Sequence, residues 1–571
     1  MAMPKLSSTT THTAQSSTSA VAASQPAVPP TSWMRISDTS GQDCRKLHTI
    51  IPAIVFALVC TFSSFSVFRN VNDWQIVGKW IGFAISAGLA VVTYSIYGLF
   101  GAKGKTLQAE SRLCSVPIIL SAVNVSVAVT CLLQYAGILK STSSFPMTSD
   151  FDNPAGVAAL LCVTVPFSST AFRSVRHNTL CFLSIAALDF TVLLLSQSRS
   201  GIIGISLCAS AYLYCTIRNR PGRIIILFVL ILLSSISLIL LFKCKSGSTS
   251  GRMTILNVCI GMIRERPLLG YGPGGFASRY MLFQADYLSH LESDELRLLA
   301  DNITHPLCGY LLIAINYGIL GLAFVLMSIT GAVLFVVKRC TRYRLPVLMT
   351  IGSVCILSMF SYPFKYPMTV VSLIVCLLYI AQDTSLHFPN SRFANIALLL
   401  SVTAAILPSV SWYRAQTMWK SMTDELETDT TKAIAARKET IPETDPVLCR
   451  NARYLYSRGA VNYYAGNLEE SLADLLTSST AVSSYDTELL LGKVYNELGK
   501  ADSAVYHWNL ASGMCPSRMK PKFFLFKLYE QLDDTAKMLN IGKELLEMPV
   551  KIPSSDTRSM RLEVRRKLFG L

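Results

Sequence analysis

The sequence predicts an all-α protein in which a polytopic membrane bundle is followed by a tetratricopeptide-like helical domain. Of the 571 residues, 51% are hydrophobic and only 15% are charged, whereas a soluble domain has roughly 25% charged residues. Apolar segments of membrane-spanning length follow one another between residues 48 and 411, which predicts about 11 spans. From residue 412 onward, charged residues return and small residues recur with the period of a helical repeat.

The composition also limits the possible partners and cofactors. A net charge of +16 would suggest nucleic acid in a soluble protein, but here Lys and Arg concentrate in short loops between apolar segments. Such a distribution reflects membrane topology, so no nucleic acid partner is expected. The sixteen cysteines are scattered, without a CxxC pair or a Cys/His cluster. The sequence therefore predicts no metal site and no cofactor.

Residues 1–46 are rich in Ser, Thr, Ala and Pro and contain no apolar run. A signal peptide requires an apolar core, which this segment lacks. The composition predicts a disordered cytoplasmic tail.

The membrane domain is expected to occupy residues 47–411. The apolar segments run over residues 48–68, 79–101, 114–136, 154–171, 179–198, 200–216, 224–242, 307–337, 346–362, 367–382 and 393–411. Basic residues follow the second, fourth, sixth and eighth segments; they are Lys103, Lys105, Arg112, Arg173, Arg176, Arg218, Arg220, Arg223, Lys338, Arg339, Arg342 and Arg344. By the positive-inside rule the N-terminus is cytoplasmic. The loop at Arg199, the long loop 243–306 and the chain after about residue 412 are then extracytoplasmic.

Residues 412–571 are predicted to form the tetratricopeptide-like domain. Gly492, Gly499 and Ala504 are preceded, about one repeat earlier, by Gly459, Gly466 and Ser471, a period of roughly 33–34 residues. Small residues let paired helices approach, so that stacked units bury one core. Two interpretations remain open: a surface that binds an acceptor or a protein partner, and a packing platform for the membrane domain.

Two stretches carry arginines on the predicted outer side. Arg199 lies in SQSRSGIIG, where small residues allow an anion to approach, and a guanidinium binds phosphate through paired hydrogen bonds. Snorkelling to lipid headgroups is the alternative. In the long loop, Arg252, Arg264 and Arg266 lie on a predicted helix that ends before Pro267, and a glycine-rich turn follows. Because no strand precedes this turn, a nucleotide-binding loop is disfavoured.

His305 stands at the outer end of the eighth segment. An imidazole titrates near neutral pH, so it could take a proton from an acceptor hydroxyl. Acidic residues of the same loop compete for the role of base; they are Asp286, Glu292, Asp294, Glu295 and Asp301. A further carboxylate, Asp189, lies within a span, where pairing with a polar neighbour is the expected role.

These stretches together resemble the O-antigen ligase and polymerase superfamily. The resemblance rests on SRSG at 198–201, Arg252, RPLLGYGPGGF at 266–276, and His305 followed by YLLIAINYGILGL at 310–322. The order, the spacing and the side of the membrane are similar over roughly residues 190–325. The predicted C-terminal repeats are also similar to the extracytoplasmic tetratricopeptide tail that some bacterial members of this superfamily carry. The sequence departs from the usual pattern at Pro306, where Asn is common, and at Asn316, near which Glu is frequent.

The resemblance implies a GT-C-like glycosyltransferase that uses an undecaprenyl-diphosphate-linked glycan without a metal or a nucleotide. Arg199 and Arg252 would bind the diphosphate, and Arg264 and Arg266 would assist. His305 would orient or deprotonate the acceptor hydroxyl, and the anomeric centre would be inverted. The acceptor would be lipopolysaccharide core, a growing glycan or a protein.

The implied location is the bacterial inner (cytoplasmic) membrane, with the C-terminal domain in the periplasm and membrane lipids in contact with the bundle. Within the same chemistry, a repeat-unit polymerase and a protein O-oligosaccharyltransferase remain alternatives to a ligase. A transporter is a different class, but transporters place ionisable residues at mid-membrane, where only Asp189 is found. A non-catalytic scaffold that recruits partners through its tail is the third class.

Overall fold

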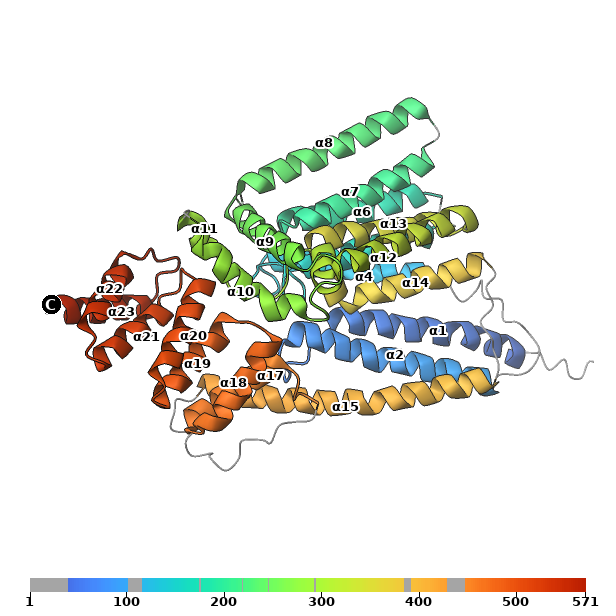
Figure 1. The fold of residues 1–571 in the computed structure, drawn as a ribbon. Coiled ribbons are helices and arrows are strands. Elements are labelled where there is room, and N and C mark those ends of the chain that lie inside the picture. Colours follow the sequence, from blue (N-terminus) through green and yellow to red (C-terminus); the bar gives the residue numbers. More distant parts are fainter. Residues whose placement is uncertain are drawn as a thin grey trace, which may run out of the picture. The chain divides into compact units, whose positions relative to one another are not determined.

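A computed structural model of the chain describes residues 39–100, 115–173, 176–217, 219–244, 246–291, 294–384, 392–428 and 447–570 (Figure 1). These residues form helices joined by turns and contain no strand, which confirms the predicted all-α class. Most of the predicted disordered tail, residues 1–38, lies outside the described residues. Helix α1 begins at Thr39, so the last residues assigned to that tail are helical.

Each predicted span coincides with a helix. The helices are α1 (Thr39–Phe65), α2 (Trp74–Phe100), α4 (Ser115–Tyr135), α5 (Pro154–Ala171), α6 (Asn178–Leu195), α7 (Arg199–Thr216), α8 (Arg220–Cys244), α12 (Gly309–Arg339), α13 (Arg344–Phe360), α14 (Pro367–Asp383) and α15 (Arg392–Thr428). Among the described residues, five helices are long and apolar enough to cross a membrane, namely α4, α5, α6, α12 and the Trp74–Ser95 part of α2. The chain is therefore a multi-pass membrane protein, and the number of its spans stays a prediction.

Helix α5 is the centre of the bundle and is buried from residue 156 to residue 169. It packs against α4, α6, α7, α13 and α14. A Cβ on Gly201 of α7 would lie 3.0 Å from the Cβ of Ala158, and one on Gly204 would lie 2.9 Å from the Sγ of Cys162. Helices in lipid associate through such close packing of small residues, so these glycines fix α7 against the central helix.

The fully buried Asp189 lies in the same core. Its carboxylate accepts a hydrogen bond from the Asn124 side-chain amide at 3.1 Å, and the same amide donates to the Thr164 hydroxyl at 3.0 Å. The three residues come from α6, α4 and α5. The predicted pairing of Asp189 with a polar neighbour is confirmed, and its role is to hold three helices together.

The loops between the helices lie at two opposite ends of the bundle. Loops that the charge pattern assigns to the same side of the membrane contact one another. At one end, Lys365 before α14 forms an ion pair with Asp152 before α5, at 3.3 Å. At the other end, Arg173 after α5 donates to the Arg342 carbonyl after α12, at 2.8 Å. Helices that cross a membrane in alternating directions require this sorting. Which end faces the cytoplasm stays a prediction from the loop charges.

The predicted long loop folds into three helices, α9 (Ser246–Glu265), α10 (Gly275–Ser289) and α11 (Asp294–Leu299). Helix α9 ends before Pro267, as predicted, although it begins before Arg252. The Asn316 side chain on α12 accepts a hydrogen bond from the Phe276 backbone N–H at 3.0 Å. This bond satisfies one of the unpaired donors at the start of α10 and ties the loop to the membrane bundle.

The glycine-rich turn after α9 packs on a break in α12. Gly318 interrupts α12 with a left-handed φ of 69°. The backbone N–H of Ile319 donates to the Pro267 carbonyl at 2.8 Å. A Cβ on Gly318 would lie only 2.0 Å from the Leu268 carbonyl oxygen. The glycines therefore permit a backbone-to-backbone contact between the loop and the broken helix.

We expect the substitution Gly318→Ala to lower the free energy of unfolding by at least about 2 kcal/mol, because a left-handed φ is costly for alanine and the new methyl group overlaps Leu268. The thermal midpoint of the purified protein in detergent measures the effect. Gly331→Ala on the same helix is the matched control, since its Cβ would meet no atom within 4 Å. Equal midpoints for the two variants would contradict the proposed backbone contact.

The predicted boundary between residues 411 and 412 lies inside helix α15, and the division into domains stays a prediction. Helix α15 continues without interruption from Arg392 to Thr428, because the polar residues after 411 keep a helical register. Trp419, beyond the expected boundary, packs against Leu448 and Tyr454. Helix α15 thus connects the predicted membrane domain with the helices that follow it.

Six of the seven described C-terminal helices pack as successive pairs, and the last packs against the helix before it. They are α17 (Ala452–Ala465), α18 (Leu468–Ala481), α19 (Tyr485–Glu497), α20 (Ala501–Met514), α21 (Lys520–Gln531), α22 (Thr535–Glu547) and α23 (Ser555–Phe569). A Cβ on Gly459 would lie 2.9 Å from Leu475, and one on Gly492 would lie 2.2 Å from the Trp508 indole nitrogen. These glycines therefore allow α17 to pack closely against α18, and α19 against α20.

The C-terminal domain shares a hydrophobic core with the predicted outer loop. Met262 of α9, Phe276 and Tyr280 of α10, and Tyr485 and Met514 of the C-terminal helices belong to one buried cluster. Gln284 of α10, which is 1% exposed, donates to the Met514 carbonyl at 2.8 Å. This contact favours the packing-platform interpretation of the tail over that of a loosely attached recruitment module.

Candidate active site

Arg199 follows a tight turn between two membrane helices. Helix α6 ends at Leu195 and α7 begins at Arg199. Between them Gln197 has a left-handed φ of 58°, and Ser198 and Ser200 are buried. The turn places the half-buried side chain of Arg199 at the N-terminus of a helix, where free backbone N–H groups favour an anion.

Arg252 of α9 lies near Arg199, although the two are far apart in the sequence. Burial lowers the pKa of the Arg252 guanidinium, and the positive charge of Arg199 lowers that pKa further. The Nη1 group of Arg252 donates to the Phe360 carbonyl at 3.4 Å. Two neighbouring guanidinium groups repel each other, and a dianion between them would convert this repulsion into charge-assisted hydrogen bonds.

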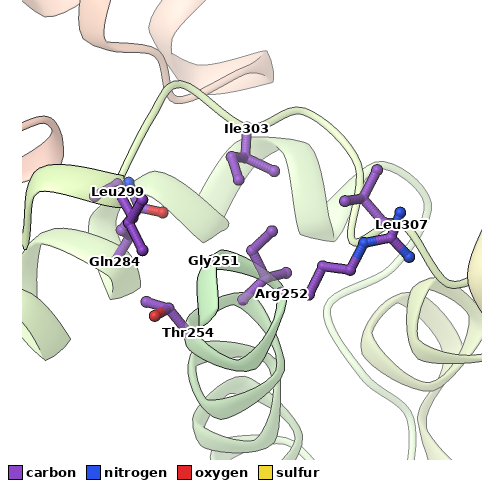
Figure 2. A pocket seen from close by; sticks show the side chains of 9 residues that line it. Gly251, Arg252, Thr254, Gln284, Leu299, Ile303 and Leu307 are labelled. Carbon is purple, nitrogen blue, oxygen red and sulfur yellow. The ribbon is translucent and has the colours of Figure 1, made fainter. Parts of the chain in front are cut away.

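A small cavity adjoins Arg252 (Figure 2). Its volume is about 230 Å³, and it is lined by Gly251, Arg252, Thr254, Ile255, Gln284, Leu299, Ala300, Ile303 and Leu307. Figure 2 shows the Arg252 side chain extending toward Leu307. The arginine therefore approaches the short turn that carries His305.

That turn fixes the tautomer of His305. Leu307 adopts a left-handed φ of 56°, a conformation that is rare for a bulky residue. Its backbone N–H thereby points back and donates to Nδ1 of His305 at 3.0 Å. Because Nδ1 accepts this bond, the proton of the neutral ring resides on Nε2. His305 is thus set as an Nε2–H donor, which favours orienting a substrate oxygen over deprotonating a hydroxyl.

The surroundings keep the His305 ring neutral. Burial lowers the pKa of His305 from 6.5 to about 4, and the nearby positive charge of Lys365 contributes to the shift. The ring also meets the edge of Tyr362, with centroids 5.0 Å apart. The donor form therefore persists throughout the neutral pH range.

We expect the ¹³C resonance of His305, in protein labelled at its histidines, to titrate near pH 4, as the pKa of about 4 requires. Since the unfolded chain takes up this proton first, His305 lowers the stability of the fold progressively as the pH falls from 6.5 to about 4. Lys365→Met should raise the titration midpoint, whereas Lys365→Arg, which retains the charge, should not. A midpoint near 6.5 in the unmodified protein would contradict this description of the site.

The segment between α13 and α14 contributes residues that sequence reasoning missed. The Lys365 ammonium lies 5.2 Å from the centroid of the Tyr362 ring and pairs with Asp152. Tyr366 also donates to Asp152, at 2.8 Å, and the Asn153 amide donates to the Tyr362 hydroxyl at 3.0 Å. One signal in the sequence could have revealed them: a lysine in a short loop on the predicted outer side, where the positive-inside rule disfavours it.

A long apolar groove begins beside His305. It has a volume of about 1150 Å³, larger than most small-molecule sites of roughly 300–1,000 Å³. His305, Tyr362 and Lys365 line one part of it, together with Asp73 and Arg453. The rest is lined by apolar residues of α12, α13 and α14. This apolar groove shares Ile303 and Leu307 with the smaller cavity next to Arg252.

The structure does not bring Arg264 and Arg266 to this group. Arg264 lies twelve residues after Arg252 on the same helix, which corresponds to a distance of roughly 18 Å along its axis. The Arg266 guanidinium lies 5.2 Å from the centroid of the Tyr271 ring instead. Both side chains are exposed at the other end of α9, a placement that does not favour the prediction that this pair assists at the diphosphate.

The acidic residues that compete with His305 for the role of base are exposed, engaged in an ion pair, or outside the described side chains. Asp286 and Glu295 are exposed, whereas Glu292 and the side chain of Asp294 lie outside the described residues. Asp301 forms an ion pair with Arg518 at 2.7 Å, and this contact helps to lower the pKa of Asp301. Asp301 therefore serves as an anchor.

The C-terminal domain holds the segment that leads to His305. Besides the Asp301–Arg518 pair, the side-chain amide of Asn302 donates to the Ser484 hydroxyl at 3.2 Å and to Asp486 at 3.0 Å. These anchors lie three and four residues before His305 in the sequence. The C-terminal helices thus position the turn that carries His305.

We expect Asn302→Ala and Arg518→Ala to reduce the activity of this site by about threefold to tenfold, since a loosened segment misplaces His305. Steady-state rates of the purified variants measure the effect. Lys567→Ala is the control, because it breaks an ion pair with Glu530 within the C-terminal domain. A rate unchanged in both test variants would show that the tail does not position the site.

No metal centre emerges from the described part of the chain, where no group of three or more His, Cys, Asp or Glu side chains is placed to hold an ion. In comparison with known protein families, residues 184–326 match the family described as O-antigen ligase. The matched segment contains Arg199, Arg252 and His305. No curated protein and no solved structure matches the chain significantly.

Proposed function

We propose that this chain, whose residues 184–326 match the O-antigen ligase family, transfers a glycan from undecaprenyl diphosphate to an acceptor outside the cytoplasm. The observation that carries the proposal is the convergence of Arg199, Arg252, His305 and Lys365 beside an apolar groove. A lipid-linked diphosphate has both a negatively charged head, which the converging cations can bind, and an apolar chain, which the groove can accommodate.

In the proposed reaction, the acceptor oxygen forms a bond to the anomeric carbon while the bond from that carbon to the diphosphate breaks. The electron pair of the broken bond leaves with the undecaprenyl diphosphate. Arg199 and Arg252 stabilise this growing negative charge, as preorganised cations do at departing phosphates. Attack from the opposite face inverts the anomeric centre.

His305 contributes as a neutral donor. Its Nε2–H group hydrogen-bonds a substrate oxygen, and the Leu307 N–H on Nδ1 fixes the ring for this task. The proton of the acceptor hydroxyl passes to the departing diphosphate, which becomes basic as the bond to carbon breaks. No lone pair of His305 is required in this step.

Transport is less well supported by the same structure. The intramembrane carboxylate Asp189 is fully buried against Asn124 and lines neither the small cavity nor the apolar groove. Transporters instead expose such residues along a pathway near mid-membrane. A purely scaffolding function would leave the converging cations without a purpose.

The direct test is transfer of a defined glycan from undecaprenyl diphosphate by the purified protein, with a chelator present. Lipopolysaccharide core, a growing glycan and a protein serve as alternative acceptors, and product formation with one of them supports the proposal. No transfer to any acceptor by correctly folded protein would refute it. Glycan analysis of a deletion strain then separates the three acceptor classes: unlinked long chains indicate a ligase, short chains a polymerase, and unglycosylated proteins a protein transferase.

A further inference from the structure

Tyr362 lies where the parts of the candidate active site meet. It stands on the segment between α13 and α14, and its half-buried side chain lines the same groove as His305. The edge of one ring meets the other, with centroids 5.0 Å apart, and the Lys365 ammonium lies 5.2 Å from the centroid of the Tyr362 ring. A polar group on this ring therefore faces the same substrate as His305.

The Asn153 side chain fixes the role of the Tyr362 hydroxyl. The side-chain oxygen of Asn153 accepts the backbone N–H groups of Ala155 and Gly156, at 2.8 and 3.3 Å, at the start of α5. Its amide nitrogen therefore faces Tyr362 and donates to the hydroxyl oxygen at 3.0 Å. Since the oxygen accepts this bond, the hydroxyl hydrogen points elsewhere, and none of the hydrogen bonds within the described part of the chain uses it.

The surroundings of Tyr362 keep its phenol protonated. Burial raises the pKa of the Tyr362 phenol, and the negative charge of Asp152 raises this pKa further. The Asn153 hydrogen bond and the positive charge of Arg252 act in the opposite direction without cancelling the shift. The phenol is therefore a hydrogen-bond donor throughout the neutral pH range. The charged and titratable groups around it come from several segments; they are Asp152, Arg252, His305, Lys365 and Tyr366.

The charges around the Tyr362 hydroxyl favour an anion as its acceptor. Arg252 lies close enough for each of the two groups to shift the pKa of the other. The nearby carboxylate of Asp152 is already engaged by Lys365 and Tyr366. The hydroxyl hydrogen thus lies among cations, where an oxygen that gains negative charge is a better acceptor than a neutral sugar hydroxyl.

We propose that the Tyr362 hydroxyl is a further catalytic group, which donates a hydrogen bond to the leaving oxygen of the donor diphosphate. This inference rests on the proposed function and adds a residue to its site. When the bond from the anomeric carbon to that oxygen breaks, the electron pair stays on the oxygen, so the hydrogen bond from Tyr362 strengthens as the negative charge grows. Tyr362 keeps its own proton, and the proton of the acceptor hydroxyl passes to the departing diphosphate.

The test compares Tyr362→Phe with the unmodified full-length protein in nanodiscs, using undecaprenyl diphosphate that carries a defined glycan and the acceptor identified by the transfer assay. The substitution keeps the ring beside His305 and removes only the hydroxyl. The value of kcat is expected to fall by about 10²-fold. The KM for the donor should change by no more than about threefold, because the hydrogen bond strengthens only as the bond to carbon breaks.

Tyr287→Phe is the matched control. The Tyr287 hydroxyl on α10 also accepts a hydrogen bond from an asparagine amide, that of Asn257, at 3.2 Å. Tyr287 lines neither the small cavity nor the apolar groove. Its loss of a hydroxyl should therefore change kcat by no more than about twofold.

A second variant separates chemistry from packing and carries the test should Tyr362→Phe fold poorly. Tyrosine fluorinated next to its hydroxyl, placed at position 362, keeps the shape of the side chain and makes the phenol a stronger acid. The alkaline limb of the kcat profile should then shift to lower pH, because a phenolate cannot donate a hydrogen bond. A purely structural role of Tyr362 would leave this limb where it is.

The outcomes separate this inference from the proposed function. An unchanged kcat in Tyr362→Phe, a loss confined to KM, or an unmoved alkaline limb in the fluorinated variant would each overturn the role of Tyr362 and leave the function intact. Absence of transfer by the unmodified protein would refute both. A lower kcat in Tyr362→Phe together with the shifted limb would support both.

Discussion

Arg252→Ala is expected to lower the rate of glycan transfer from undecaprenyl diphosphate by about 10²–10³-fold, because it removes a preorganised charge from the departing diphosphate. The effect should appear in the turnover rate as well as in the affinity, since the negative charge of the leaving group increases during the reaction. Arg199→Ala should behave similarly, because Arg199 lies close enough to depress the pKa of Arg252.

Three other arginines of the same loop serve as controls. Arg264→Ala and Arg266→Ala should change the rate by no more than about twofold, since both residues lie at the far end of α9 from Arg252. Arg279→Ala should be equally mild, because Arg279 of α10 lies with Arg266 close to Tyr271. Arg252→Lys should retain partial activity, because an ammonium keeps the charge but loses the paired hydrogen bonds. Equal effects at all these positions would mean that a general basic surface, and not a defined site, attracts the donor.

His305→Ala is expected to reduce transfer by about 10²-fold, and the conservative variants reveal why. If His305 acts as an Nε2–H donor, His305→Gln should recover activity to within about tenfold of the unmodified enzyme, because its amide can also donate. A general base cannot be replaced in this way, since an amide does not take up a proton near neutral pH.

The measurement is the steady-state rate with purified variants, together with the thermal midpoint of each, so that loss of fold is distinguished from loss of chemistry. If His305→Gln is as inactive as His305→Ala at equal stability, the donor role is contradicted and the general-base role of His305 is favoured. An acidic limb in the pH–rate profile near 6.5 would argue in the same direction, because the structure lowers the pKa of His305 to about 4.

The helical framework could be predicted almost completely from the sequence. Long apolar segments leave few alternatives to helices in a membrane, since every backbone polar group must be satisfied within its own segment. The charge pattern also predicted which loops meet, as the contacts of Lys365 and Arg173 illustrate. The boundary predicted at residue 412 falls inside α15, because hydropathy marks where an apolar segment ends, whereas this helix continues to Thr428.

The site could be predicted only in part. Arg199, Arg252 and His305 were identifiable because each is a polar group at the end of an apolar segment or in the loop beside it. Their surroundings depend on tertiary packing, which brings Tyr362 to His305 from another part of the chain. The tautomer depends on a left-handed φ at Leu307, a feature that no local preference of leucine predicts.

For the C-terminal helices too, the sequence predicted the local structure but not its contacts. The repeat pattern at Gly459 and Gly492 predicted paired helices, but it left open what the exposed faces of those helices contact. The buried cluster of Met262, Phe276 and Tyr485 arises from surfaces that are far apart in the sequence. Neither surface carries a recognisable motif for the other.

The most direct test of the central claim is the affinity of the purified protein in nanodiscs for undecaprenyl diphosphate, measured with a chelator present. If guanidinium groups hold the diphosphate, the variant with both Arg199→Ala and Arg252→Ala should bind at least about tenfold more weakly, while the variant with Arg264→Ala and Arg266→Ala should bind as the unmodified protein does. Equal affinities for all three proteins would contradict the claim.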